Sequence, residues 1–173
     1  MIGRIFSIIS VVLLPLAAGA LPLTGLYRTI DDETGRARSV VALYEYADDA
    51  GQARLAGRIV ALYNDAGQIS ELPGNAVRVA KKVAGTPTVV GMDIIWTMNW
   101  DDGKNQYSGG NIMDPENGKV YSSVIWRDGA TLNVRGKIGP FGRTQNWQPV
   151  DTSDMPAALQ NLDTTNWKPI IRK

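Results

Sequence analysis

The chain of 173 residues contains no cysteine and no histidine. Their absence excludes disulfides, zinc sites built from Cys and His, thiolate nucleophiles, Ser-His-Asp triads and haem held by an axial histidine. Net charge is almost absent too, because 18 Lys and Arg stand against 17 Asp and Glu. This balance argues against a nucleic-acid partner, which would require an excess of basic residues. We therefore predict no catalytic residue, no metal site and no cofactor.

Long apolar runs are also scarce, and the one that is present lies at the N-terminus. Arg4 precedes an uncharged run over residues 5–16, and the small-residue sequence AGA follows at 18–20. These are the three parts of a secretory signal peptide. A transmembrane anchor is the alternative, but about 20 apolar residues are needed to cross a bilayer, and Pro15 interrupts the run. Residues 1–20 are thus predicted to be a cleaved signal peptide of an exported protein, periplasmic or secreted, with no stable membrane span after processing.

The remaining chain consists of short apolar or alternating segments separated by turns rich in Asp, Asn and Gly, which predicts β-strands. The expected strands are residues 23–30, 38–46, 54–63, 89–98, 107–113, 119–127, 131–138 and 141–147. No helical stretch alternates with them, so a parallel sheet of βαβ units is not expected. Successive hairpins most economically remove their sheet edges by closing. The prediction is an all-β fold, a single antiparallel up-and-down barrel of about eight strands over residues 21–147, with a two-sheet sandwich as the alternative.

Two segments fall outside this pattern. Residues 64–88 form a long connection in which Asn75 is placed to cap a short helix over 75–83, although three valines weaken that helix. Residues 148–173 form a tail. Within the tail, residues 154–162 predict a short helix with Asp154 as its N-cap and a proline in its first turn.

Three motifs resemble those of an exported family, the domain of unknown function 2147. The opening motif is residues 23–35 (LTGLYRTIDDETG), the central one is 111–121 (NIMDPENGKVY), and the closing one covers 134–139 (VRGKIG) and 141–147 (FGRTQNW). The resemblance implies a lipocalin-like, calycin-type barrel in the cell envelope or outside the cell, and no known activity. Tyr27 stands where the family usually has Trp, and residues 81–85 (KKVAG) stand where many members carry a Cys pair.

The resemblance also implies a structural role for Gly25, Tyr27 and Arg143. In lipocalin-like folds an arginine of the last strand covers an aromatic side chain of the first. A planar guanidinium can stack on an aromatic ring while it donates hydrogen bonds. Arg143 shares a face of its expected strand with Phe141 and Trp147. We therefore expect Arg143 to be buried against Tyr27, to close one end of the barrel, and to be needed for stability.

Aromatic side chains gather on the later strands, and eight-stranded barrels either hold one small ligand or are filled by side chains. The leading hypothesis is a non-catalytic binding module for a small, largely apolar molecule. The candidate ligand-binding residues are Met92, Trp96, Tyr121 and Trp126. A structural or protein-interaction domain with a filled barrel is the first alternative.

Acidic residues cluster at 31–33, 48–49, 101–102 and 114–116. A hydrolase that uses two carboxylates is therefore the second alternative, because glycosidases work with such a pair. Each cluster lies in an expected turn beside Gly or Pro, where Asp is common for conformational reasons alone. Turn formation is the simpler explanation of these clusters.

Overall fold

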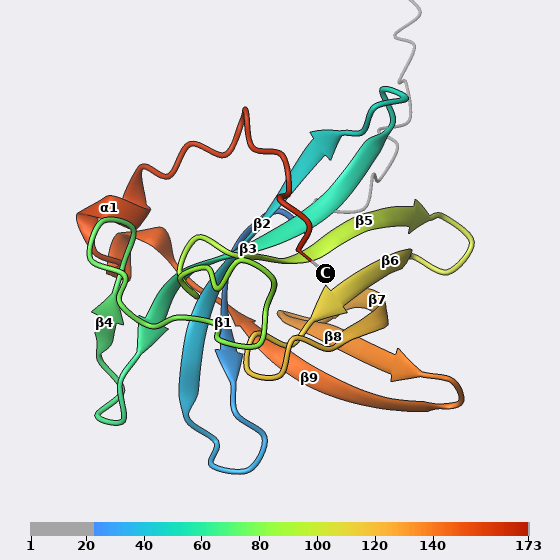
Figure 1. Cartoon of the computed structure of the whole chain (residues 1–173). Helices are drawn as coiled ribbons and strands as arrows, with labels where there is room; N and C mark the ends of the chain where they lie inside the picture. The colour runs from blue at the N-terminus through green and yellow to red at the C-terminus, as the bar shows by residue number, and fades with distance from the viewer. Residues whose placement is uncertain (1–22, 173) are drawn as a thin grey trace, which may run out of the picture.

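The computed structural model describes residues 23–172, so the predicted signal peptide lies outside the described residues. Within these residues the chain forms nine strands and two short helical segments (Figure 1). In chain order these are β1 (Gly25–Ile30), β2 (Ala37–Ala47), β3 (Ala53–Tyr63), β4 (Ile69–Glu71), β5 (Asp93–Asp101), β6 (Gln106–Met113), β7 (Val120–Asp128), β8 (Thr131–Ile138), β9 (Phe141–Pro149), the 3₁₀ segment η1 (Thr152–Asp154) and α1 (Ala157–Gln160). Among these described residues, no helix has the length and apolar composition to span a membrane.

Eight of the strands close into an antiparallel barrel. The hydrogen-bonded order is β2-β1-β9-β8-β7-β6-β5-β3, and pairing of β2 with β3 completes the ring. Strand β1 meets β9 through the pairs Tyr27–Pro149 and Arg28–Gln148. The short β4 adds to β3 outside the ring. The predicted all-β barrel is therefore confirmed, with one extra strand.

The strand boundaries differ from expectation mainly at β5. This strand begins at Asp93 rather than at residue 89, because Gly91 has a φ of +93° and Met92 N donates to Val89 O in a turn. The expected helix over 75–83 is not formed. Residues 72–92 are a loop that carries one isolated bridge, Val79–Thr88.

The expected helix in the tail is shorter than predicted. Asp154 ends η1, whose N-cap is Asp151, and α1 begins only after Pro156. A proline in the first helical turn is compatible with a helix start, but the residue that precedes a proline is driven into an extended conformation. Met155 accordingly has ψ of 156°, which separates the two segments.

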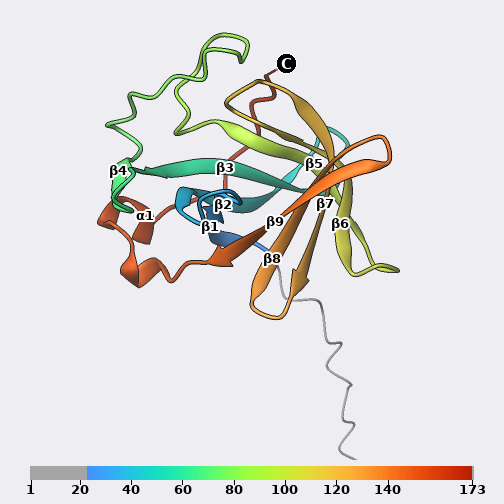
Figure 2. The same ribbon diagram turned by 90° about the horizontal axis from the view of Figure 1, so that it is seen from below.

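The tail covers the outside of the barrel. Figure 2 shows the chain leaving β9, forming η1 and α1 near β4, and returning to its end near β5. Met155 and Leu159 of the tail pack against the outward side chains of β2 and β3. This outer cluster comprises Leu26, Val40, Ala42, Val60, Ala61, Tyr63, Met155 and Leu159. The outward faces of β2 and β3 are thus buried like an interior, which explains why these strands read as continuous apolar runs instead of alternating.

A buried ion pair fixes the end of the tail. Arg58 donates two hydrogen bonds of 2.9 Å to the carboxylate of Asp93, which also accepts from the Tyr44 hydroxyl at 2.7 Å and from Ile170 N at 2.9 Å. The Arg58 guanidinium lies 4.2 Å from the ring centroid of Trp167. Because Asp93 is only 2% exposed, these four donors and the adjacent cation are what make its burial tolerable.

Candidate functional site

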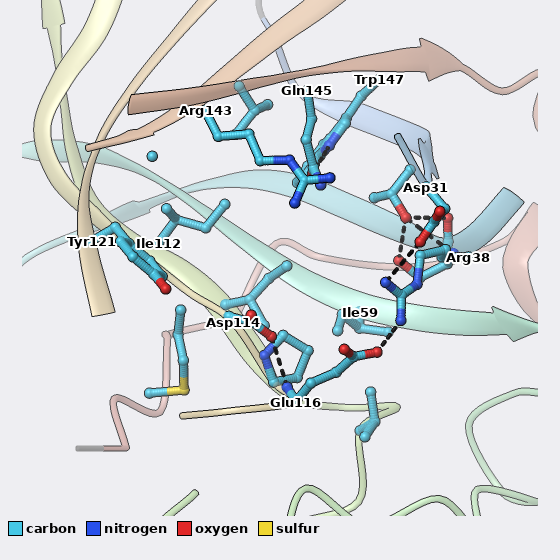
Figure 3. A pocket seen from close by; sticks show the side chains of 18 of the residues that line it. Asp31, Arg38, Ile59, Ile112, Asp114, Glu116, Tyr121, Arg143, Gln145 and Trp147 are labelled. Atoms are coloured by element: carbon cyan, nitrogen blue, oxygen red, sulfur yellow. Dashed lines mark hydrogen bonds and ion pairs between the residues drawn. The ribbon is translucent and has the colours of Figure 1, made fainter. Parts of the chain in front are cut away.

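The barrel interior is filled at one end and hollow at the other. The hollow has a volume of about 930 Å³ and opens among the β1–β2 turn, the β6–β7 turn, the β8–β9 turn and the 72–92 loop (Figure 3). Drug-sized ligands occupy pockets of roughly 300–1,000 Å³ in proteins. The site is therefore large enough for one small molecule.

Large side chains fill the closed end. The main apolar cluster includes Tyr27, Met98, Ile125, Leu132 and Trp147, all 8% exposed or less. Leu132 lies opposite Trp147 in the β8–β9 register, which places both residues at the level where β9 turns toward the tail. Trp147 is 1% exposed yet lines the hollow, so its ring forms part of the floor.

Smaller or shorter side chains line the walls above this floor. Ile59, Ile94, Ile112 and Val134 supply apolar surface. Gly136 contributes no side chain at a position where a Cβ would lie 3.4 Å from Ile112 Cγ2. The lining also includes two small polar residues, Thr29 and Ser39, whose hydroxyls bond each other at 2.7 Å. This part of the wall thus presents mainly apolar surface.

The rim of the cavity is charged. Arg38 bridges Asp31, at 3.0 Å, and Glu116, which ties the β1–β2 turn to the β6–β7 turn (Figure 3). Arg143 pairs with Asp32 at 2.6 Å, and this contact raises the pKa of the guanidinium. The pKa of Asp31 is lowered, first by hydrogen bonds from Thr34. The acidic residues at the mouth therefore serve turns and ion pairs.

The 72–92 loop forms one side of the mouth and is anchored by a buried carboxylate. Glu71, 6% exposed, accepts hydrogen bonds from Val77 N at 2.8 Å and Arg78 N at 2.9 Å. Burial alone would raise the pKa of Glu71, but these amides and the nearby Arg78 cation lower it further than burial raises it. On the other side, Gly118 of the β6–β7 turn lies directly against the carbonyl of Lys82. Both contacts hold the loop over the barrel end.

Of the four predicted ligand-binding residues, the structure places Tyr121 in the cavity wall. Met92 and Trp96 are buried in the main cluster, at 3% and 2% exposure, and do not line the cavity. The expected inward orientation of Trp126 is wrong. Ile125 is the inward residue, so Trp126 lies on the outer surface, where it lines a separate hollow of about 440 Å³.

The predicted closure of the barrel by Arg143 and Tyr27 is also wrong. The Arg143 side chain is 62% exposed at the rim, and Tyr27 lies opposite Pro149, six residues further along β9. That separation is about 20 Å at the usual strand rise. Tyr27 is instead contacted by Arg127 of β7, whose Nη2 donates to the Tyr27 hydroxyl at 3.2 Å. Burial of Tyr27 raises its pKa although Arg127 acts in the opposite sense.

One part of the Arg143 prediction is confirmed. Phe141, Arg143, Gln145 and Trp147 all line the cavity, so they share the inward face of β9. Their depth differs, because β8 and β9 run past the ring and join in an exposed turn: Phe141 is 80% exposed and Trp147 is 1% exposed. Gly25 begins β1 with a φ of +132°, a conformation that favours glycine.

Sequence reasoning missed the residues that define the rim and the floor. Arg38 lies in none of the three motifs. Gln145 and Trp147 lie in the closing motif, but neither is among the predicted ligand-binding residues. Arg127 could have been found from the alternation of β7, since it lies two residues after the inward Ile125. Among residues 23–172, no group of three or more acidic side chains is arranged to hold a metal ion.

The comparisons with known proteins agree with this barrel. Residues 25–149 match the model of DUF2147, described as an uncharacterized protein family conserved in bacteria. The match covers most of the chain, and the chain therefore belongs to the DUF2147 family. None of the curated proteins matches it.

A solved structure extends the comparison to the fold. The chain resembles protein HP1028 from the human pathogen Helicobacter pylori, which is described as belonging to the lipocalin family. The TM-score is 0.58 at 18% sequence identity, and the alignment covers 78% of this chain and 86% of HP1028. At this identity the likeness shows a lipocalin-like fold and nothing more specific.

Proposed function

We propose that this protein is a non-catalytic binding module that holds a small, largely apolar molecule in the open half of its barrel. The observation that carries the proposal is the unequal filling of the interior. Large side chains pack one end, while about 930 Å³ remains above Trp147 between walls of Ile and Val side chains. A barrel with a purely structural role gains stability from complete filling, because an unfilled apolar volume costs packing energy.

The rim residues support binding rather than hydrolysis. Asp31 and Glu116 both pair with Arg38, and Asp114 accepts hydrogen bonds within its own turn. A carboxylate pair for glycoside hydrolysis needs one member with a raised pKa to donate a proton. The pKa of Asp31 is lowered instead. A non-catalytic role is accordingly part of the proposal.

A neutral apolar dye provides the test. Nile red should bind the wild-type protein with one site per chain. Ile112→Trp should weaken this binding about ten-fold or more, because the larger side chain fills cavity space that the dye would otherwise occupy. Val124→Trp is the matched control, since Val124 lies on the outer surface of the neighbouring strand. Absence of saturable binding, or equal effects of the two variants, would contradict the proposal.

We also propose export across a membrane, on the basis of the charge, apolar run and AGA sequence in residues 1–20. The protein recovered from outside the cytoplasm should then begin at Leu21. N-terminal sequencing that finds Met1 retained, or a start beyond Thr24, would contradict this proposal.

A further inference from the structure

Most hydrogen-bond acceptors that line the cavity already have a donor from the protein, whereas several of the lining donors have no acceptor among the described residues. Asp31 accepts from Glu33 N, from Thr34 and from Arg38. Asp114 accepts from Glu116 N and Asn117. The side-chain oxygen of Gln145 accepts from Trp147 Nε1 at 3.1 Å. Glu33 is the exception, and it lies exposed in the β1–β2 turn.

The free donors lie at the top of the cavity. Arg143 uses Nε to bind Asp32, and within residues 23–172 its two terminal nitrogens have no hydrogen-bond partner. The same holds in this part of the chain for the amide nitrogen of Gln145 and for the hydroxyl of Tyr121. In Figure 3, Arg143 and Gln145 point into the cavity from β9, and the Tyr121 hydroxyl points into it from β7.

Two further cations extend this donor surface. Lys81 and Lys82 line the mouth from the 72–92 loop, and neither forms an ion pair within the described residues. Arg38, by contrast, has both terminal nitrogens occupied by carboxylates. A ligand that enters this mouth therefore meets unused N–H and O–H groups and few unused oxygens, which is a surface that favours an anionic, acceptor-rich group.

The apolar part of the site lies directly below these donors. Arg143 and Trp147 are four residues apart on the inward face of β9, a depth of about 13 Å at the usual strand rise. Ile59, Val134 and the Trp147 ring surround that depth. A single alkyl chain fits the space between the floor and the rim, and its head group would then lie beside Arg143.

We propose that the ligand is a single-chain anionic amphiphile, whose alkyl chain occupies the apolar end of the cavity and whose carboxylate or phosphate head is bound by Arg143 with Gln145. This assignment rests on the proposed ligand-binding function and specifies its ligand class. Arg143 is a binding residue in this account, whereas sequence reasoning gave it a role in stability.

Matched ligands test the assignment. Decanoate and 1-decanol share one alkyl chain, and only decanoate carries a charge at neutral pH. By isothermal titration calorimetry, wild-type protein should bind decanoate about ten-fold tighter or more, because charge-assisted hydrogen bonds are stronger than neutral ones. Decyl phosphate, measured in parallel, decides which anionic head is preferred. Tighter binding of either anion than of decanol supports the proposal.

Variants then locate the head group. Arg143→Gln should remove most of the preference for decanoate over 1-decanol, because the charged head group loses its cationic partner. Arg36→Gln is the matched control, because Arg36 is exposed in the β1–β2 turn, carries the same charge, and does not line the cavity.

The outcomes separate this inference from the proposed function. If neither decanoate nor decyl phosphate binds more tightly than decanol, or if Arg143→Gln and Arg36→Gln have equal effects, the amphiphile assignment is overturned and binding in the cavity is left intact. Binding of Nile red without binding of either anion would also overturn it. Failure of Nile red, decanol and both anions to bind would refute the proposed function itself.

Discussion

Asp93 is the residue on which the attachment of the tail depends most. It is buried, and its charge is balanced by Arg58 while Tyr44 and Ile170 N complete its hydrogen bonds. Burial and the contact with Asp93 both raise the pKa of the Tyr44 hydroxyl, which therefore remains a donor. Asp93→Asn should lower the free energy of unfolding by about 3–5 kcal/mol, because Arg58, whose side chain is only 17% exposed, loses its counter-ion.

Urea denaturation measures this loss, and Asp101→Asn is the matched control. Asp101 pairs with Lys104 at 3.2 Å, but the lysine is 70% exposed, so this pair should contribute about 1 kcal/mol or less. Comparable losses in the two variants would contradict the account of Asp93.

Arg143 should contribute little to stability. Its side chain is 62% exposed and its ion pair with Asp32 lies at the surface. Arg143→Lys should therefore shift the free energy of unfolding by about 1 kcal/mol or less, since exposed pairs are screened by solvent. A loss of several kcal/mol in urea denaturation would show instead that Arg143 closes the barrel.

The sequence predicts which face of a strand a residue occupies more reliably than how deep in the barrel that residue lies. The alternation of β9 correctly groups Arg143 with Trp147, but it cannot show that β8 and β9 extend beyond the ring. On β7, Tyr121 and Trp126 are five residues apart and so lie on opposite faces of a regular strand. Assigning Trp126 inward reversed the face of Arg127 as well, because a shift by one residue reverses the orientation of every side chain in a strand.

Among the elements, the 72–92 loop depends on the charge of Glu71. The pKa of this carboxyl is lowered in the folded protein, so its contribution to stability is present above its unfolded pKa and is lost as the pH falls through the folded value. Glu71→Gln should lower the free energy of unfolding by about 1–3 kcal/mol near pH 7. The difference from wild type should narrow only as the pH falls below the ordinary Glu pKa of about 4.3 and through the lower folded value, because Glu71 is then protonated and both side chains are neutral.

Urea denaturation across pH and hydrogen exchange at Val77 N and Arg78 N follow this effect. Both amides should exchange faster in Glu71→Gln, because they donate to that carboxylate. Glu33→Gln is the control, since Glu33 is exposed in a turn and its replacement should change the free energy of unfolding little near pH 7. A pH-independent loss in Glu71→Gln would contradict the role of its charge.

Most elements follow from local patterns, and the exceptions have local causes. Alternation and turn residues predict all eight strands of the ring. The start of β5 was placed too early because residues 89–92 are apolar, although they form a turn at Gly91. The 72–92 loop has no periodic pattern. Its conformation depends on a contact with Glu71, which directly precedes the loop, and on a contact with Gly118, which is distant in sequence.

For the whole molecule, the tail acts as an outer layer of the core. Leu159 is 1% exposed and belongs to the outer cluster on β2 and β3. Leu159→Ala should lower the free energy of unfolding by about 2–5 kcal/mol, the usual cost of emptying a buried leucine site. Ile171→Ala, in an exposed part of the same tail, should cost little. Chemical denaturation in which both variants match wild type would show that the tail does not stabilise the barrel.

Closure of the barrel could be predicted from the hairpin order, whereas the cavity could not. Whether the interior is open depends on how side chains from eight strands meet, for example Gly136 opposite the large groups of Ile112 and Tyr121. No single segment of the sequence shows how these side chains pack together. The cavity is thus a property of the assembled molecule. The central claim of this account is that a ligand binds in it.

Intermolecular nuclear Overhauser effects test that claim most directly. With protein labelled at Ile and Val methyl groups, 1-decanol is a suitable ligand because its binding does not depend on the head-group assignment. The account predicts contacts from the decanol chain to the methyl groups of Ile59, Ile112 and Val134, which line the cavity. Contacts confined to outer-surface methyl groups such as that of Val124, or no contacts at saturating decanol, would contradict it.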